Sequence, residues 1–232
     1  MVSVIACSKR PDFLVNLYRN FDQQQIPEKQ LVLALHGLDG SVPDEIGNDP
    51  RCLVLHLPTE MPLGMCLNKA VKHSKFDVIA KFDDDDYYAP HYLFEAVAVL
   101  EKRQAEVVGK QSYLVYFKEE QLLAMLNPGK GDKQIRDDSD TLAGATLVFK
   151  KGVFEKVEFP RINIGEDLAF LDECRKQSIP IYASSPLHYI YIRYSNTHHT
   201  SDSGNNRLRK QCVPLLRTKN IAKYASVIWK GE

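Results

Sequence analysis

Four consecutive aspartates at residues 83–86 are the part of this chain whose type and spacing point most directly to chemistry. Adjacent carboxylates repel one another, most strongly where protein surroundings lower the dielectric constant. A divalent cation that prefers oxygen ligands would offset that repulsion. The apolar residues 77–82 predict a buried strand before the run, and Pro90 a helix after it. Because ligands bind at the carboxyl ends of strands in open α/β sheets, this placement predicts a metal that holds a phosphate-bearing ligand. A solvated acidic turn is the alternative.

An alternation of strands and helices has to position these carboxylates. Apolar runs predict strands at 2–6, 30–35, 52–57, 78–82, 112–117, 146–150, 179–183 and 189–193. Helical spacing of apolar residues predicts helices from Pro11, over 64–74, after Pro90 and from Gly165, and polar composition predicts loops at 127–140 and 195–206. The pattern predicts an α/β fold with a central, mostly parallel sheet flanked by helices.

Bulk composition excludes several classes of protein. The chain has 232 residues and no formal net charge, so nothing global favours a nucleic-acid partner. It has no apolar stretch of about 18 residues, and residues 1–7 predict a first strand rather than a signal peptide. Five widely spaced cysteines without a CxxC pair indicate neither a zinc site nor a disulfide framework. Reduced thiols in a cytoplasmic protein are the expectation.

Taken together, these segments resemble the GT-A fold glycosyltransferases, most closely the inverting enzymes of family 2, over roughly residues 2–200. Four pieces carry the resemblance: the opening strand with the turn at 8–11, the Gly-x-x-x-Asn helix at 64–68, the acidic run, and Glu166-Asp167 at a helix start. The acidic run is similar to the DxD signature that a tyrosine and a proline follow. The order and spacing of the four pieces together are more specific than any one of them.

The resemblance implies a single GT-A catalytic domain at 1–206, with a nucleotide-binding half at 1–110 and an acceptor-binding half at 111–206. It implies a metal-dependent inverting transferase that moves a sugar from a UDP-sugar to a hydroxyl of a glycan, a lipid-linked acceptor or a glycoconjugate, in the synthesis of cell-surface polysaccharide or glycoconjugate. Mn²⁺ or Mg²⁺ would neutralise the departing diphosphate.

The resemblance also assigns roles within the acidic run. Asp85 is the first choice as a direct metal ligand, and Asp83 contacts the ribose or the metal through water. Asp84 could replace either, because a run of four aspartates leaves the register open. Asp86 is expected to cap the following turn.

Two further motifs supply candidate catalytic and metal-binding groups. Asp167 is the candidate general base, and Glu166 is its rival, since one residue of register decides between them. Both could instead only favour the N-terminus of a helix through its dipole. Some GT-A enzymes bring a late histidine to the metal, so either His198 or His199 could complete its shell; a polar loop is the alternative.

Besides Asp83 and Asp84, four residues are candidates for contacts to the nucleotide. Ser8 and Arg10 lie in the turn after the first strand, and Arg10 and Lys69 could meet the diphosphate or the ribose. Asp39 could hydrogen-bond the base, although Asp39-Gly40 can also be a simple turn. The family often has arginine before the helix asparagine, whereas this chain has Leu67.

The tail at 207–232 is basic, and its interleaved apolar residues predict an amphipathic helix that packs on the domain. Peripheral contact with the inner face of a membrane is the second interpretation. Two other functions compete with the transferase. A nucleotidyltransferase usually has a glycine-rich turn after the first strand, which residues 7–11 lack. A non-catalytic nucleotide-binding module is the other alternative.

Overall fold

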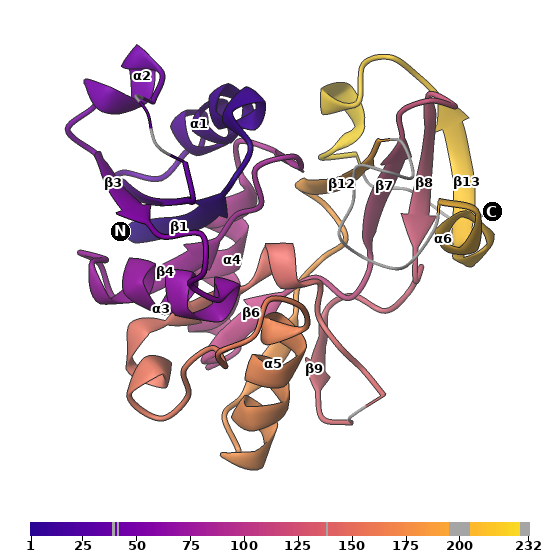
Figure 1. Cartoon of the computed structure of the whole chain (residues 1–232). Coiled ribbons are helices and arrows are strands. Elements are labelled where there is room, and N and C mark those ends of the chain that lie inside the picture. The colour runs from indigo at the N-terminus through magenta and orange to yellow at the C-terminus, as the bar shows by residue number, and fades with distance from the viewer. Residues whose placement is uncertain (39, 41, 138, 195–204, 228–232) are drawn as a thin grey trace.

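The computed structural model describes residues 1–38, 40, 42–137, 139–194 and 205–227. Two sheets organise this part of the chain (Figure 1). The larger sheet carries the N-terminal strands and lies between helices, and the smaller sheet stands beside it with the C-terminal segment at its edge. Within the described residues, no helix combines the length and the apolar character needed to cross a membrane.

The larger sheet has eight strands in the order β3-β2-β1-β4-β10-β6-β11-β9. Their bounds are β1 Val2–Ser8, β2 Lys29–His36, β3 Cys52–Leu57, β4 Val78–Lys81, β6 Val107–Gly109, β9 Lys133–Ile135, β10 Val148–Lys150 and β11 Ile181–Ala183. Strands β1 to β4 pair in parallel, as do β6 and β11, while β10 runs antiparallel between β4 and β6. The predicted mostly parallel central sheet is confirmed.

Helices cover both faces of this sheet. They are α1 Leu14–Asp22, α2 Asp44–Gly47, α3 Leu63–Lys72, α4 Tyr92–Lys102 and α5 Glu166–Lys176, with 3-10 turns η1 Pro11–Phe13, η2 Gly144–Thr146 and η3 Lys151–Glu155. The helix α6 Asn205–Gln211 and the 3-10 turn η4 Ala222–Tyr224 pack against the smaller sheet instead. Side chains alternate across β1: Val4 and Ala6 pack with α1 and α4, whereas Ile5 packs with α3 and α5. On β4, Ile79 packs on the α3 side and Ala80 on the α1 side, so the acidic run follows a strand that is buried on both faces.

The smaller sheet has the order β13-β8-β7-β12-β5. Its strands are β5 Tyr87–Tyr88, β7 Tyr113–Phe117, β8 Leu122–Leu126, β12 Tyr189–Arg193 and β13 Cys212–Arg217. Since β5 begins directly after Asp86, residues 83–86 connect the two sheets. Phe82 and Tyr88 flank this connection, and their rings stack with centroids 3.8 Å apart, which holds its two ends together.

Two predictions about irregular segments are wrong. In the described part of the basic tail, α6 is followed by the strand β13, which pairs antiparallel with β8, and then by the short 3-10 turn η4. Pro214 is compatible with this strand because β13 is an edge of the sheet, where a missing N–H is tolerated. The segment 127–140 is not wholly a loop, because β9 within it pairs with β11.

Candidate active site

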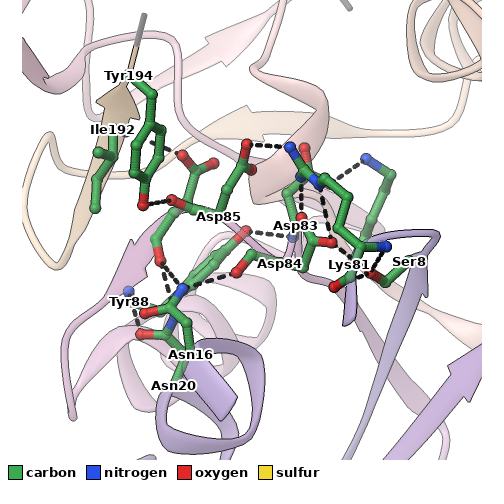
Figure 2. Close-up of polar contacts among 12 residues, drawn as sticks. Ser8, Asn16, Asn20, Lys81, Asp83, Asp84, Asp85, Tyr88, Ile192 and Tyr194 are labelled. Carbon is green, nitrogen blue, oxygen red and sulfur yellow. Dashed lines mark hydrogen bonds and ion pairs between the residues drawn. The ribbon is translucent and has the colours of Figure 1, made fainter. Parts of the chain in front are cut away.

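Asp84 is the fixed centre of the acidic run (Figure 2). Ser8 Oγ donates to its Oδ2 at 2.5 Å, and the Arg10 guanidinium forms an ion pair with the same carboxylate. Only 3% of the Asp84 side chain is exposed. Burial raises the pKa of Asp84, while Arg10 and Ser8 lower it. Asp84 thus holds the turn against the end of β1, and Ser8 and Arg10 occupy its carboxylate oxygens.

Asp85 lies beside this pair and is less enclosed, with 10% of its side chain exposed. Arg10 also reaches it, with Nη1 2.8 Å from Asp85 Oδ2. The Tyr194 hydroxyl donates to the Asp85 carbonyl oxygen at 3.2 Å, so the second sheet contacts the same turn (Figure 2). One guanidinium therefore supplies the positive charge that two neighbouring carboxylates require.

Asp86 does not cap the following turn as predicted. Its carboxylate accepts hydrogen bonds from the Tyr189 hydroxyl at 2.6 Å and from the Ile192 backbone N–H at 3.0 Å. Burial and the neighbouring Asp85 raise its pKa well above the usual range. The prediction fails because both partners come from β12, more than 100 residues later. Asp86 is a structural link between the turn and the second sheet.

The backbone of the turn is held from the other side by α1. Asn16 Nδ2 donates to the carbonyl oxygens of Asp84 at 2.7 Å and of Asp86 at 3.0 Å, and Asn20 Nδ2 donates to the Asp86 carbonyl at 2.8 Å (Figure 2). These amides lie four residues apart, on one face of the helix. Backbone carbonyls that would otherwise face solvent or the core are thereby satisfied, which keeps the carboxylates in one arrangement.

Lys81 is a residue of the site that the sequence reasoning missed. It lies at the end of β4 with its side chain buried, and its Nζ contacts Asp83 Oδ1 at 2.9 Å (Figure 2). Burial lowers the pKa of Lys81, but Asp83, Asp167 and Glu166 together raise it above its usual value. The signal was a single charge inside an otherwise apolar strand. Lys81 joins the acidic run electrostatically to the Glu-Asp motif.

Asp167 and Glu166 begin α5 and differ in their surroundings. Glu166 is buried, and burial raises the pKa of its carboxyl group. Asp167 is half-buried, and its Oδ1 accepts a hydrogen bond from the Leu168 N–H at 2.8 Å. Its other oxygen lies against Gly144: a Cβ placed on Gly144 would sit 1.5 Å from Asp167 Oδ2. The absence of a side chain at Gly144 leaves room for this carboxylate.

The Gly-x-x-x-Asn motif of α3 acts on the segment that leads to this acid pair. Asn68 Nδ2 donates to the Phe159 carbonyl at 2.9 Å, and Asn68 Oδ1 accepts from the Phe159 N–H at 3.0 Å. Gly64 allows close approach, because a Cβ there would lie 1.9 Å from the Pro160 carbonyl oxygen. Its N–H donates to the Ile162 carbonyl. The motif fixes residues 158–164, and through them the start of α5.

Asn68→Ala is expected to lower the free energy of unfolding by about 2–4 kcal/mol, because it leaves two buried backbone groups of Phe159 without partners. Urea denaturation followed by circular dichroism measures the change. Lys69→Ala, at the exposed neighbouring position of the same helix, is the matched control and should change stability by less than about 0.5 kcal/mol. Equal stability of the two variants would contradict the role assigned to Asn68.

The structure brings together some predicted residues and not others. Ser8 and Arg10 contact the aspartates themselves. Lys69 is exposed on α3, and the structure shows no contact of its side chain to the acidic run. Asp39, His198 and His199 lie outside the described residues. Their predicted contacts to the base and the metal stay predictions.

The carboxylates fit a hard divalent cation. In the described part of the chain, the aspartates do not bring three carboxylate oxygens within 4.8 Å of one another. Mg²⁺ commonly uses one or two protein carboxylates and completes its shell with water and substrate phosphates, so a cage is not required. Asp83, with 43% of its side chain exposed, and Asp85 are the carboxylates able to take part. Arg10 forms ion pairs with both Asp84 and Asp85, which shows that these two carboxylates attract a positive charge.

Solved structures of other proteins share this fold. The structure is similar to TarS residues 1–349 from S. aureus in complex with UDP-GlcNAc, with a TM-score of 0.59 and 17% identity over 83% of this chain and 58% of that one. It is also similar to the mannosyltransferase PcManGT from Pyrobaculum calidifontis in complex with GDP-Man and Mn²⁺, with a TM-score of 0.63 and 13% identity over 85% and 57% of the two chains. The predicted GT-A fold is confirmed.

The family follows from the sequence. The model of the family described as Glycosyl transferase family 2 matches residues 39–157, slightly more than half of the 232 residues. The chain belongs to glycosyl transferase family 2, as its motifs predicted. No curated protein matches it. The chain spans about three fifths of the length of the solved TarS and PcManGT chains.

Proposed function

We propose that this chain is a metal-dependent, inverting glycosyltransferase that moves a sugar from a nucleoside diphosphate, with UDP as the expected nucleotide, to a hydroxyl acceptor. The observation that carries the proposal is the pairing of two acidic sites through one buried lysine. Lys81 contacts Asp83 in the acidic run. The negative charges of Asp167 and Glu166 at the start of α5 also raise the pKa of Lys81. One acidic site serves the leaving diphosphate and the other serves the attacking hydroxyl.

At the donor side, Asp83 and Asp85 are the residues that would hold Mn²⁺ or Mg²⁺. When bound, the metal supplies positive charge to the departing diphosphate. Arg10 is already oriented over Asp84 and Asp85 by two ion pairs, which places a second cation at the same edge of the sheet. Ser8 and the α1 asparagines keep the turn rigid, so little reorganisation accompanies donor binding.

At the acceptor side, Asp167 is the proposed general base. It would accept the proton of the acceptor hydroxyl while that oxygen attacks the anomeric carbon and the bond to the diphosphate breaks on the opposite face. Its Oδ1 is oriented by the Leu168 N–H, and its Oδ2 rests on Gly144. Burial raises the pKa of the neighbouring Glu166, and the positive charge of Lys81 opposes that rise.

The nucleotide and the acceptor are parts of the proposal that rest on likeness. The TarS structure holds UDP-GlcNAc and the PcManGT structure holds GDP-Man, so relatives of this fold use more than one base. A glycan, a lipid-linked sugar or a glycoconjugate is the proposed acceptor, with the reaction in the cytoplasm. Peripheral attachment to the inner face of a membrane has weaker support, because two cations of the tail, Arg209 and Arg217, contact Glu120 instead.

Slow hydrolysis of the donor tests the function without a known acceptor. We expect the purified chain to release UDP from a UDP-sugar in the presence of Mn²⁺, and to stop when the metal is chelated with EDTA. A panel that includes GDP-mannose identifies the base. Release of pyrophosphate from nucleoside triphosphates would support the nucleotidyltransferase instead. Binding of UDP without any turnover would support the non-catalytic module.

A further inference from the structure

Three metal-ligating side chains converge at a place that neither the acidic run nor the Glu-Asp motif uses. They are Cys7 at the end of β1, His36 at the end of β2 and Cys66 on α3, and one ligand atom of each lies within 4.8 Å of the other two. The sequence indicated no zinc site because the cysteines have no CxxC spacing. That expectation overlooked ligands from separate elements, which only the folded sheet brings together.

The topology explains the convergence. Ile5 and Val32 point to the face of the sheet that α3 covers, where both belong to one apolar cluster with Leu67. Since side chains on a strand alternate, Cys7 follows Ile5 and His36 follows Val32 on that same face. Parallel pairing of β1 with β2 brings their carboxyl ends together. Ser8, by contrast, points to the other face, toward Asp84.

His36 is oriented as a metal-binding histidine. Its Nε2 lies 2.9 Å from the carbonyl oxygen of Thr59, which can only accept a hydrogen bond. Nε2 therefore donates to this carbonyl, and Nδ1 is the ring nitrogen left for a metal. Metal-bound histidines commonly donate the other ring N–H to such a carbonyl. Gly37, with a φ of 65°, lets Thr59 approach: a Cβ at Gly37 would lie 2.2 Å from Thr59 Oγ1.

The two cysteines already interact with each other. The sulfur atoms lie within 4.8 Å of one another, and this closeness raises the pKa of the Cys7 thiol, which burial raises further, and lowers the pKa of Cys66. Cys66 Sγ also lies 3.7 Å from the Met61 carbonyl oxygen. Both side chains are free thiols, Cys66 buried and Cys7 half-buried. A cation that binds both sulfurs would take the place of the protons they now carry and release them to solvent.

We propose that Cys7, His36 and Cys66 form a binding site for a thiophilic divalent cation, with Zn²⁺ as the expected occupant and water in the fourth position. Zn–S bonds of about 2.3 Å place two sulfurs about 3.8 Å apart in a tetrahedron, so the ligands need to move inward by no more than about 1 Å. Two thiolates and a neutral imidazole balance the charge of Zn²⁺. Soft ligands disfavour Mg²⁺ and Mn²⁺, which separates this site from the acidic run.

A bound cation would join β1, β2 and α3 at the edge of the sheet next to Ser8. Ligands that bind only the folded state stabilise it, so Zn²⁺ should raise the melting temperature of the chain. The site does not depend on the proposed transferase activity, and an inactive chain would bind the cation equally well.

Cobalt(II) is the probe, because its bonds to thiolates give a charge-transfer band in the near ultraviolet that carboxylates do not give. The full chain is reduced with a phosphine, stripped of metal and titrated with Co²⁺. We expect the band to saturate at one equivalent and to disappear when Zn²⁺ is added. The absence of the band in the wild-type chain would overturn the proposal.

Variants identify the ligands. Cys66→Ala should lose the band, and His36→Ala should weaken Co²⁺ binding at least tenfold. Cys52→Ala, which removes a half-buried thiol on β3 outside the cluster, is the matched control and should keep both the band and the affinity. A band that persists in Cys66→Ala, or an unchanged affinity in His36→Ala, would refute the assigned ligand set.

A second measurement avoids variants that fail to fold. Zn²⁺ should protect Cys7 and Cys66 of the wild-type chain from alkylation, as read by peptide mass spectrometry, and should leave Cys52 as reactive as before. Equal alkylation of Cys7 and Cys66 with and without Zn²⁺ would argue against the site.

Discussion

Asp85→Ala is expected to remove metal-dependent binding of UDP and to lower turnover by more than about a hundredfold. Asp84 is enclosed by Ser8 and Arg10, and Asp86 is hydrogen-bonded to β12. Asp85 and Asp83 are therefore the carboxylates that can bind a cation. Arg10 Nη1 lies 2.8 Å from Asp85 Oδ2 and keeps this carboxylate in place. Isothermal titration of UDP with and without Mn²⁺ measures the first effect, and donor hydrolysis measures the second.

The fold should survive this substitution. Asp84 keeps its contacts with Ser8 and Arg10, and the buried Asp86 loses a repulsive neighbour. The free energy of unfolding should therefore change by less than about 1 kcal/mol. Asp12→Ala, at an exposed acid of η1, is the matched control and should bind and turn over like the wild type. Metal-dependent UDP binding of wild-type strength in Asp85→Ala would exclude Asp85 as a ligand.

The N-terminal half of the fold was predictable because its signals are local. Apolar runs and helical spacing mark β1 to β4 and the helices α1 and α3, though not the short α2, and parallel pairing follows from their alternation. The acidic run stood out for the same reason, since four carboxylates after a buried strand form a pattern within ten residues. Glu166-Asp167 was found through its likeness to the family's Glu-Asp motif at a helix start.

The remaining features depend on contacts between distant residues. Ser8 and Arg10 contact Asp84 although 74–76 residues separate them in the sequence. The local sequence of the acidic run therefore could not show which of its aspartates binds the metal. The strand β13 was predicted as a helix because its apolar residues suit either element until β8 is seen beside it. Cys7, His36 and Cys66 likewise become one cluster only when β1, β2 and α3 are assembled.

Asp167→Asn is expected to keep UDP binding and to lower turnover by about a thousandfold, because the amide cannot accept the proton of the acceptor hydroxyl. The replacement is nearly isosteric, and its carbonyl oxygen can still accept from the Leu168 N–H. Single-turnover kinetics with a donor and an acceptor separates the chemical step from binding. Full activity in Asp167→Asn, together with a thousandfold loss in Glu166→Gln, would move the base to Glu166.

Gly144→Ala tests the same carboxylate through its position. The new Cβ would lie 1.5 Å from Asp167 Oδ2, so the carboxylate must move, and a displacement of this size should lower turnover by roughly a hundredfold. Gly152→Ala, where nothing lies within 4 Å of the added carbon, is the matched control. If Gly144 acts only by leaving room for the base, the double variant Gly144→Ala, Asp167→Asn should turn over almost as fast as Asp167→Asn alone. Fully additive losses in the double variant would mean that Gly144 and Asp167 act on different steps.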